Sequence, residues 1–215
     1  MENIKKINIP NKEELIKGIR KFEEHEKRDS MYKVATFLIS HFWNSPSDMA
    51  DGLGVLLLTW NQAFYRYGNF DFDKLEVCIR NHLEELKKFR TRDISTLSEI
   101  DEPSIKVIFE EFMKSLQIAS GNMRGRKSPV AVAKTLHLLA PNFFPLWDDR
   151  IAKAYGCYYN DNPAEKYIQF MKLMRQFAQQ IKDSVDFLNT LNYPAKTLLK
   201  VIDEYNYSKY TKEWI

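Results

Sequence analysis

The chain has 215 residues, of which 44% are hydrophobic and 28% charged, a composition typical of one large globular domain or two small lobes. The formal net charge of +3 is too small to indicate a nucleic-acid partner by itself. The two cysteines, Cys78 and Cys157, exclude a four-cysteine zinc or iron–sulfur site. We therefore expect no metal and no cofactor.

Cysteine usage and hydropathy also bear on location. Two thiols far apart in the sequence favour a reducing compartment. Residues 1–15 lack the apolar segment of a signal peptide, and the longest apolar run, 55–58, is too short to span a bilayer. We expect a cytoplasmic monomer that does not associate with membranes.

Apolar residues recur at helical spacing along most of the chain. In chain order, the predicted helices cover residues 13–27, 30–42, 51–67, 71–90, 103–118, 130–140, 149–156, 163–182 and 185–205. In the second helix, Ser30 is the expected N-cap and the expected apolar face holds Val34, Phe37, Leu38 and Phe42. Later caps are expected at Ser128, before Pro129, and at Asp148 or Asp149.

Outside these helices no stretch alternates as a strand does, so the predicted fold is all-α. We expect a single all-α domain over residues 1–215, arranged as a two-lobed helical globule with a cleft between the lobes. The possible lobes are residues 45–140, with a helix-hairpin-helix-like hairpin at 120–130, and residues 1–44 together with 141–215.

The helix predicted over 51–67 is apolar until it reaches two amides, Asn61 and Gln62, beside Trp60. An amide offers both a donor and an acceptor, so these side chains could read the edge of a DNA base. The alternative is that they satisfy polar groups in a helix–helix contact.

A glycine-containing basic turn precedes the helix predicted over 130–140. Its exposed N–H groups and basic side chains suit a phosphate oxygen, and its glycines allow close approach. The turn residues are Gly121, Arg124, Gly125 and Arg126. Lys127 follows them, where the helix dipole, the arginines and any burial would favour a neutral, nucleophilic amine. The alternatives are that Lys127 is a plain surface lysine, or that Lys134, two turns into the helix, is the reactive one.

The third segment places Asp148 after Phe144 and Trp147, at the start of the next helix. An aspartate in this position is usually an ordinary N-cap. In an aromatic, partly desolvated setting it could also stabilise a sugar cation.

Taken together, residues 53–156 resemble the helix-hairpin-helix DNA glycosylase superfamily, in particular its archaeal 8-oxoguanine glycosylase branch. The resemblance rests on the amide-bearing helix, the glycine-containing basic turn, a lysine followed seven residues later by a second, and the Asp148–Lys153 string.

This resemblance implies a base-excision glycosylase with AP-lyase activity on double-stranded DNA, which flips out and removes a damaged base such as an oxidised purine. Lys127 would attack the sugar, and Asp148 would assist. The implied DNA contacts are Asn61, Gln62, Gly121, Arg124, Gly125 and Arg126, and the implied base pocket holds Trp60, Phe144 and Trp147.

Two other interpretations stay open: a non-catalytic helical DNA-binding protein and a protein-interaction module. The aromatic and basic segment 205–215 could dock on a partner or fold back onto the body. The four histidines are dispersed, and no common hydrolase or phosphate-loop motif occurs. We expect His137, on the same helix face as Lys134, to be an interface histidine.

Overall fold

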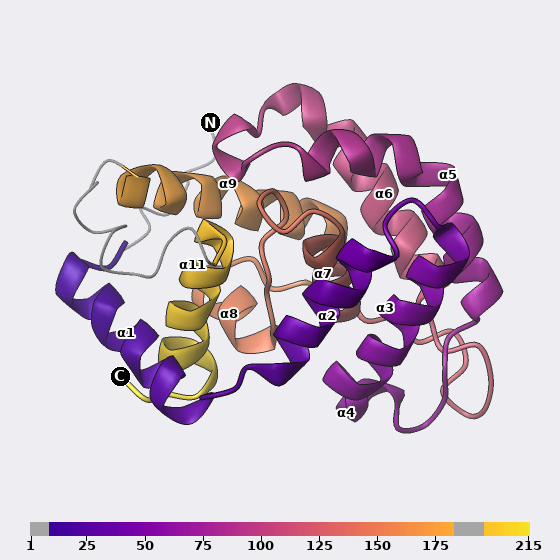
Figure 1. Cartoon of the computed structure of the whole chain (residues 1–215), viewed down its shortest axis with the longest axis horizontal. Coiled ribbons are helices and arrows are strands. Elements are labelled where there is room, and N and C mark those ends of the chain that lie inside the picture. Colours follow the sequence, from indigo (N-terminus) through magenta and orange to yellow (C-terminus); the bar gives the residue numbers. More distant parts are fainter. Residues whose placement is uncertain (1–8, 183–195) are drawn as a thin grey trace.

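The computed structural model describes residues 9–182 and 196–215, and within these residues it is helical throughout, without a β-strand (Figure 1). This confirms the all-α class. The elements are α1 (Lys12–His25), α2 (Ser30–His41), α3 (Pro46–Trp60), α4 (Gln62–Tyr65), α5 (Phe72–Arg90), η1 (Ile94–Thr96), η2 (Glu99–Asp101), α6 (Glu102–Ser115), α7 (Pro129–Leu139), α8 (Asp149–Ala154), α9 (Pro163–Lys182), α11 (Leu198–Asn206) and η3 (Tyr207–Thr211).

Several helix boundaries follow from capping residues in the sequence. Ser128 accepts a hydrogen bond from the Ala131 N–H at the start of α7, and Asp148 accepts one from the Ile151 N–H at the start of α8. Both caps were predicted, and α9 has the predicted bounds. Residues 185–195 of the last predicted helix lie outside the described residues, and α11 covers its remainder.

Two predicted helices differ from the observed ones. The helix expected over 51–67 begins earlier, with Pro46 in its first turn, and is interrupted at Asn61, where α3 ends. Asn61 leaves helical geometry there, with φ −119° and ψ 34°. The break leaves backbone carbonyls at the end of α3 without helical partners.

The buried face of α2 matches the predicted one only in part, because Leu38 and Phe42 are half-buried against the core but Val34 and Phe37 are not. Ala35 and Ile39 are buried, whereas Val34 is 49% and Phe37 67% exposed. Alanine and isoleucine define a narrow stripe that packs against α3 and α7, and this leaves the neighbouring apolar stripe uncovered. The helix also starts one residue earlier than expected, because Ser30 is its first residue and Asp29 occupies the N-cap.

The helices pack around one continuous buried cluster that draws side chains from α1 through α11. In Figure 1, α1 lies beside α11, α2 crosses the front of the molecule, and α3 and α5 run side by side. Gly54 permits the α3–α5 approach, because a Cβ there would lie 2.1 Å from the Phe72 ring. Division into two lobes with a cleft stays a prediction. No helix in the described ranges is long and apolar enough to cross a membrane.

Candidate functional site

The basic turn between α6 and α7 is closed by backbone hydrogen bonds. The Gly125 N–H donates to the Ile118 carbonyl at 2.8 Å, and the Ile118 N–H donates to the Arg126 carbonyl at 2.9 Å. Gly121 and Gly125 have φ values of +78° and +84°, a left-handed conformation that favours glycine. Arg124 and Arg126 are exposed, so the turn presents its positive charge to solvent.

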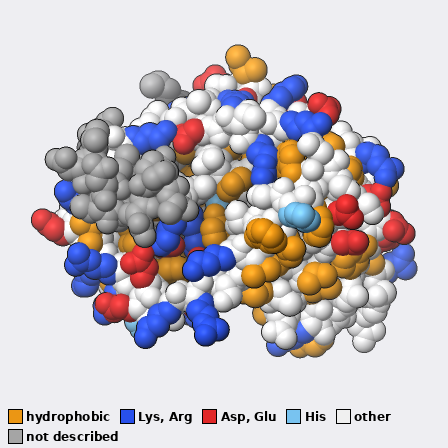
Figure 2. All heavy atoms as spheres, viewed as in Figure 1, with side chains coloured by type: hydrophobic (Ala, Val, Ile, Leu, Met, Phe, Trp, Pro, Cys, Tyr) orange, Lys and Arg blue, Asp and Glu red, His pale blue; other side chains and the backbone are white. Residues whose placement is uncertain are grey.

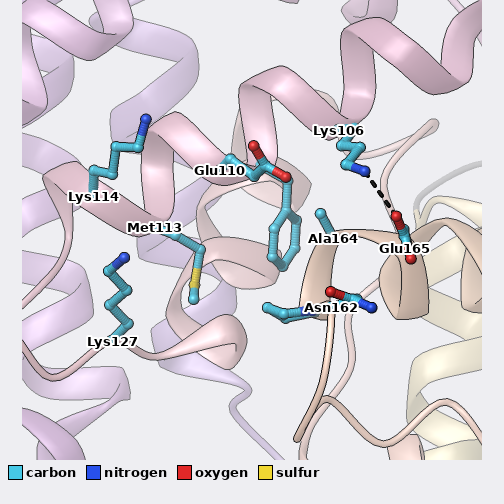
Figure 3. A pocket seen from close by; sticks show the side chains of 10 residues that line it. Lys106, Glu110, Met113, Lys114, Lys127, Asn162, Ala164 and Glu165 are labelled. Carbon is cyan, nitrogen blue, oxygen red and sulfur yellow. Dashed lines mark hydrogen bonds and ion pairs between the residues drawn. The ribbon is translucent and has the colours of Figure 1, made fainter.

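Lys127 lies at the end of this turn and is exposed. Figure 3 shows it beside Met113 and Lys114 on the wall of a cavity of about 300 Å³ between α6 and the start of α9. The Lys106–Glu165 ion pair, 2.7 Å long, lies at the other side of the cavity. None of the interactions of the described residues joins Lys127 to Asp148. The two predicted catalytic residues are therefore not in direct contact.

Lys134, by contrast, reaches from the middle of α7 to the end of α3. Its ammonium donates to the Trp60 carbonyl at 2.8 Å and lies 4.8 Å from the centroid of the Trp60 ring. No ion pair of Lys134 occurs within the described part of the chain. Burial lowers the pKa of Lys134 to about 8, although the charges of Asp203 and Asp148 act to raise it. The charge of Asp148 therefore acts on Lys134, the alternative candidate for the reactive lysine.

Asp148 is held by hydrogen bonds to both carboxylate oxygens. Oδ1 accepts from the Ile151 N–H at 2.8 Å, and Oδ2 accepts from the Thr211 hydroxyl at 2.5 Å. Thr211 belongs to η3, a π-helical turn that continues α11. The two donors fix the orientation of the carboxylate. Asp148 can therefore serve as a fixed negative charge near the Lys134 amine.

Helix α11 adds a second carboxylate and a second lysine to this cluster. Lys200 is buried, and its Nζ lies 3.1 Å from Asp29, 3.6 Å from Glu204 and 3.8 Å from Asp203. Burial raises the pKa of Asp203 to about 7; Lys200 opposes this shift, and the charge of Asp148 adds to it. Lys134, Asp148, Asp203 and Lys200, from α7, α11 and the N-cap of α8, are linked by charge: Asp203 and Asp148 act on the pKa of Lys134, and Lys200 and Asp148 act on that of Asp203. We refer to these four residues as the cluster.

His137, one turn after Lys134, is neutral and structural. Its Nδ1 lies 2.7 Å from the Phe144 carbonyl, and its Nε2 lies 3.1 Å from the Tyr32 hydroxyl. A carbonyl can only accept, so Nδ1 carries the proton and Nε2 accepts from Tyr32. Burial lowers the pKa of His137 to about 4. This arrangement agrees with the interface role expected for His137.

The predicted DNA-reading amides have separate surroundings. Asn61 donates from Nδ2 to the Ser128 hydroxyl at 3.2 Å, a contact between the end of α3 and the start of α7. This is the helix–helix contact weighed as the alternative. Gln62 is exposed and could reach a ligand.

The predicted base pocket requires a correction. Phe144 is fully buried against Phe89 and Phe143, and Trp147 is only 2% exposed and packs on Tyr167. Neither ring presents a face on which a base could stack. Trp60 is the one member of the predicted pocket that lies in the site, where its carbonyl and ring hold Lys134.

The sequence interpretation missed Asp203, Lys200 and Thr211. A signal existed for the first two, because Lys200 and Asp203 are charged residues one turn apart in the otherwise apolar segment 198–203. Nothing in the sequence marked Thr211, which reaches Asp148 only through the folded arrangement.

Comparisons with known proteins identify no relative: no protein family, no curated protein and no solved structure matches the chain. In residues 9–182 and 196–215 no group of three or more His, Cys, Asp or Glu side chains is arranged to hold a metal. The chemistry of the cluster must therefore be inferred from its own residues.

Proposed function

We propose that the protein is a DNA base-excision glycosylase with AP-lyase activity, in which Lys134 rather than Lys127 is the nucleophile. The observation that carries this proposal is a half-buried lysine, held by a backbone carbonyl and an aromatic face, whose amine is influenced by the charge of a carboxylate that two donors hold in place. With a pKa of about 8, roughly a quarter of Lys134 is a free amine at pH 7.5. An ordinary lysine is about 0.1% free at that pH.

A free amine beside an anionic carboxylate suits attack on an electrophilic sugar carbon. The Lys134 amine attacks C1′ of the flipped nucleotide, and Asp148 stabilises the positive charge that develops as the glycosidic bond breaks. The resulting imine permits β-elimination and strand nicking. Asp148 suits this part because its two oxygens are already oriented by donors.

The turn that precedes α7 would bind the DNA strand. Arg124, Arg126 and Lys127 are exposed on the turn that leads into this helix, where backbone N–H groups and positive charge favour a phosphate. Six residues of helix, about 9 Å of rise, separate the N-cap Ser128 from Lys134. A strand held at the turn would pass close to the amine, and Lys127 would contact phosphate rather than sugar.

Borohydride trapping on a duplex with one abasic site tests the proposal, because the imine forms there whatever base the enzyme removes. We compare Lys134→Gln with Lys127→Gln, which changes the other candidate lysine, and with the control Lys88→Gln, which changes an exposed lysine on α5 that pairs with Glu85. We expect the wild-type protein and the control to be trapped at rates within about threefold, and Lys134→Gln to be trapped at least 100-fold more slowly. An adduct that survives in Lys134→Gln, or is lost only in Lys127→Gln, would contradict the assignment.

A panel of duplexes with single modified bases, scored for nicking with and without alkali, identifies the excised base. Base release without a trapped adduct would mean a monofunctional enzyme in which water attacks and Asp148 remains essential.

One observation favours a second candidate, a protein-interaction module. Apolar side chains are uncovered on α2, and Figure 2 shows hydrophobic side chains gathered over α2 and α3 on the front face. Exposed apolar patches often mark contact with a partner. Failure to release any base or to bind duplex DNA would favour this candidate.

A further inference from the structure

We propose that a second turn extends the DNA-binding surface and binds single-stranded DNA, with the exposed ring of Tyr67 stacked on an unpaired base. The turn consists of residues 66–69, which follow α4. The inference takes DNA as the ligand from the proposed function, but it concerns binding and not the lyase reaction. It adds Arg66 and Tyr67 to the residues that contact the strand.

The turn after α4 lies against the basic turn between α6 and α7 (Figure 1). The Ala119 N–H donates to the Asn69 carbonyl at 2.8 Å, which joins the two turns through their backbones. Gly68 permits this approach, because a Cβ there would lie 2.9 Å from Cγ2 of Ile118 and 3.1 Å from the Ser120 carbonyl oxygen. The two turns therefore form one continuous surface.

The turn is held in place by the buried residues on either side of it. Tyr65 precedes the turn and Phe70 follows it, and their rings meet edge to face with centroids 5.1 Å apart. The Tyr65 hydroxyl also donates to the Leu116 carbonyl, beyond the end of α6, at 2.9 Å. A turn fixed in this way before a ligand arrives loses little conformational freedom on binding.

Both turns carry positive charge that no acidic side chain neutralises. They belong to the stretches 52–70 and 112–147, which contain no Asp or Glu. Arg66, Arg124 and Arg126 are exposed, and none of them forms an ion pair in the parts of the chain that the structure describes. The arginines that do pair lie elsewhere: Arg80, Arg92 and Arg150. Unpaired guanidinium groups gathered on one surface are complementary to the phosphates of a nucleic acid.

Tyr67 distinguishes this surface from one that is only basic. Its side chain is 56% exposed, and the Arg66 guanidinium lies 4.6 Å from the centroid of its ring. Because the guanidinium covers one face of the ring, a base would stack on the opposite face. The bases of a duplex are already stacked on one another, whereas an unpaired base has a free face. An exposed ring beside phosphate-binding arginines therefore favours single-stranded DNA.

Fluorescence anisotropy tests the proposal with a labelled oligothymidylate of about 20 nucleotides, longer than one binding domain covers, and a duplex of equal length. We compare the wild-type protein with Tyr67→Ala, which removes the ring, and with Tyr67→Phe, which keeps it. Arg66→Gln removes the neighbouring charge. The matched control is Phe37→Ala, which removes another exposed ring, on α2 and 67% exposed.

We expect the wild-type protein to bind the oligothymidylate at least as tightly as the duplex, although the duplex carries more charge. Tyr67→Ala should weaken binding of the single strand about 5- to 100-fold and binding of the duplex less than about twofold. Tyr67→Phe and Phe37→Ala should behave as wild type. Arg66→Gln should lower the salt slope on the single strand by about 0.7, the value for one phosphate contact.

Three results would overturn the proposal. Tyr67→Ala could bind the oligothymidylate as tightly as the wild-type protein does. It could lose affinity for the single strand and the duplex by the same factor, which would mean that Tyr67 only supports the turn. Tighter wild-type binding of oligouridylate than of oligothymidylate would assign the surface to RNA. If thermal melting shows that Tyr67→Ala is unfolded, Tyr67→Leu, which keeps an apolar side chain without a ring, provides the same comparison.

Borohydride trapping of the same variants on the abasic-site duplex separates this proposal from the proposed function. Trapping at the wild-type rate, together with single-strand binding that does not depend on Tyr67, removes the stacking role and leaves the glycosylase proposal intact. Binding of the oligothymidylate that depends on Tyr67, in a protein that is never trapped, keeps the surface and removes the lyase reaction.

Discussion

Lys127 and Lys134 lie seven residues apart, at the beginning and in the middle of the same helical segment, and their surroundings are opposite. Lys127 is exposed at the rim of a cavity next to a basic turn. Lys134 is largely withdrawn from water and donates to a carbonyl at the end of α3. Surroundings, rather than residue type or distance from a helix start, therefore decide which lysine can supply a free amine.

The comparison also separates phosphate binding from nucleophilic attack, which the sequence analysis had both assigned to the turn that ends at Lys127. The turn offers exposed positive charge, which acts through the solvent and is screened by salt. The Lys134 cluster is shielded, so its charges act strongly on one another over a short range. Binding and chemistry would then lie at the beginning and in the middle of α7, and substitutions can probe each separately.

The largest effect is expected from replacing Asp148, whose charge acts on Lys134. Asp148→Asn removes the negative charge but retains an N-cap oxygen for the Ile151 N–H, so the fold persists. Because the charge stabilises only the transition state, trapping should slow about 100- to 1000-fold with little change in DNA affinity. Single-turnover trapping and fluorescence anisotropy on the same duplex measure the two quantities. Equal losses in rate and affinity would mean that Asp148 binds DNA instead.

The next effect is on stability. Burial lowers the pKa of Lys134 to about 8, so between pH 8 and its unfolded value near 10.5 the native state binds fewer protons than the unfolded state. The lysine therefore destabilises the fold below about pH 8, and this penalty fades as the pH rises toward 10.5. Lys134→Met should raise the free energy of unfolding by about 2–3 kcal/mol at pH 7 and by much less at pH 10.5.

Urea unfolding at the two pH values measures this difference, with Lys127→Met as the control. The exposed control should change stability by less than about 0.5 kcal/mol. A Lys134→Met protein that is less stable than wild type at pH 7 would show that the hydrogen bond to Trp60 outweighs the cost of burial.

The smallest expected effect concerns the turn. Replacing Arg124, Arg126 and Lys127 together with alanine should weaken duplex binding about 10- to 30-fold at 0.1 M salt and reduce the salt slope by about 2–3. A triple alanine substitution of Lys74, Lys87 and Lys88 on α5 is the control, because each of these lysines pairs with an acidic residue one turn away. Equal losses in both triple variants would indicate binding by overall charge rather than by the turn.

Sequence patterns predicted the helical fold well because its signals are local. Serine and aspartate caps, a proline in the first helical turn and apolar periodicity act within a few residues, and they place α7, α8 and α9 correctly. The prediction for α2 was wrong about Val34 and Phe37, because two apolar stripes compete there and only tertiary packing selects the one that contains Ala35 and Ile39.

The candidate site was predicted only in part. Asp148 could be singled out because a cap and an aromatic neighbour occur together in the sequence. The relation between Lys134 and Asp203 could not be predicted, because 69 residues separate them and only the fold brings their charges close enough to interact. The burial of Phe144 and Trp147 could not be predicted either, because the sequence does not distinguish an aromatic side chain that fills a core from one that lines a pocket.

The acceptor closest to the Lys134 amine is the main-chain oxygen of Trp60, available because α3 ends there. This contact is made by the backbone and not by a side chain, so replacing the indole of Trp60 leaves it in place. A helix that continued through Asn61 would remove it, because the Trp60 carbonyl would then accept a helical hydrogen bond. Replacing the peptide bond after Trp60 with an ester would weaken this carbonyl as an acceptor. The hydrogen bond of the Lys134 amine would then weaken although every side chain stayed the same.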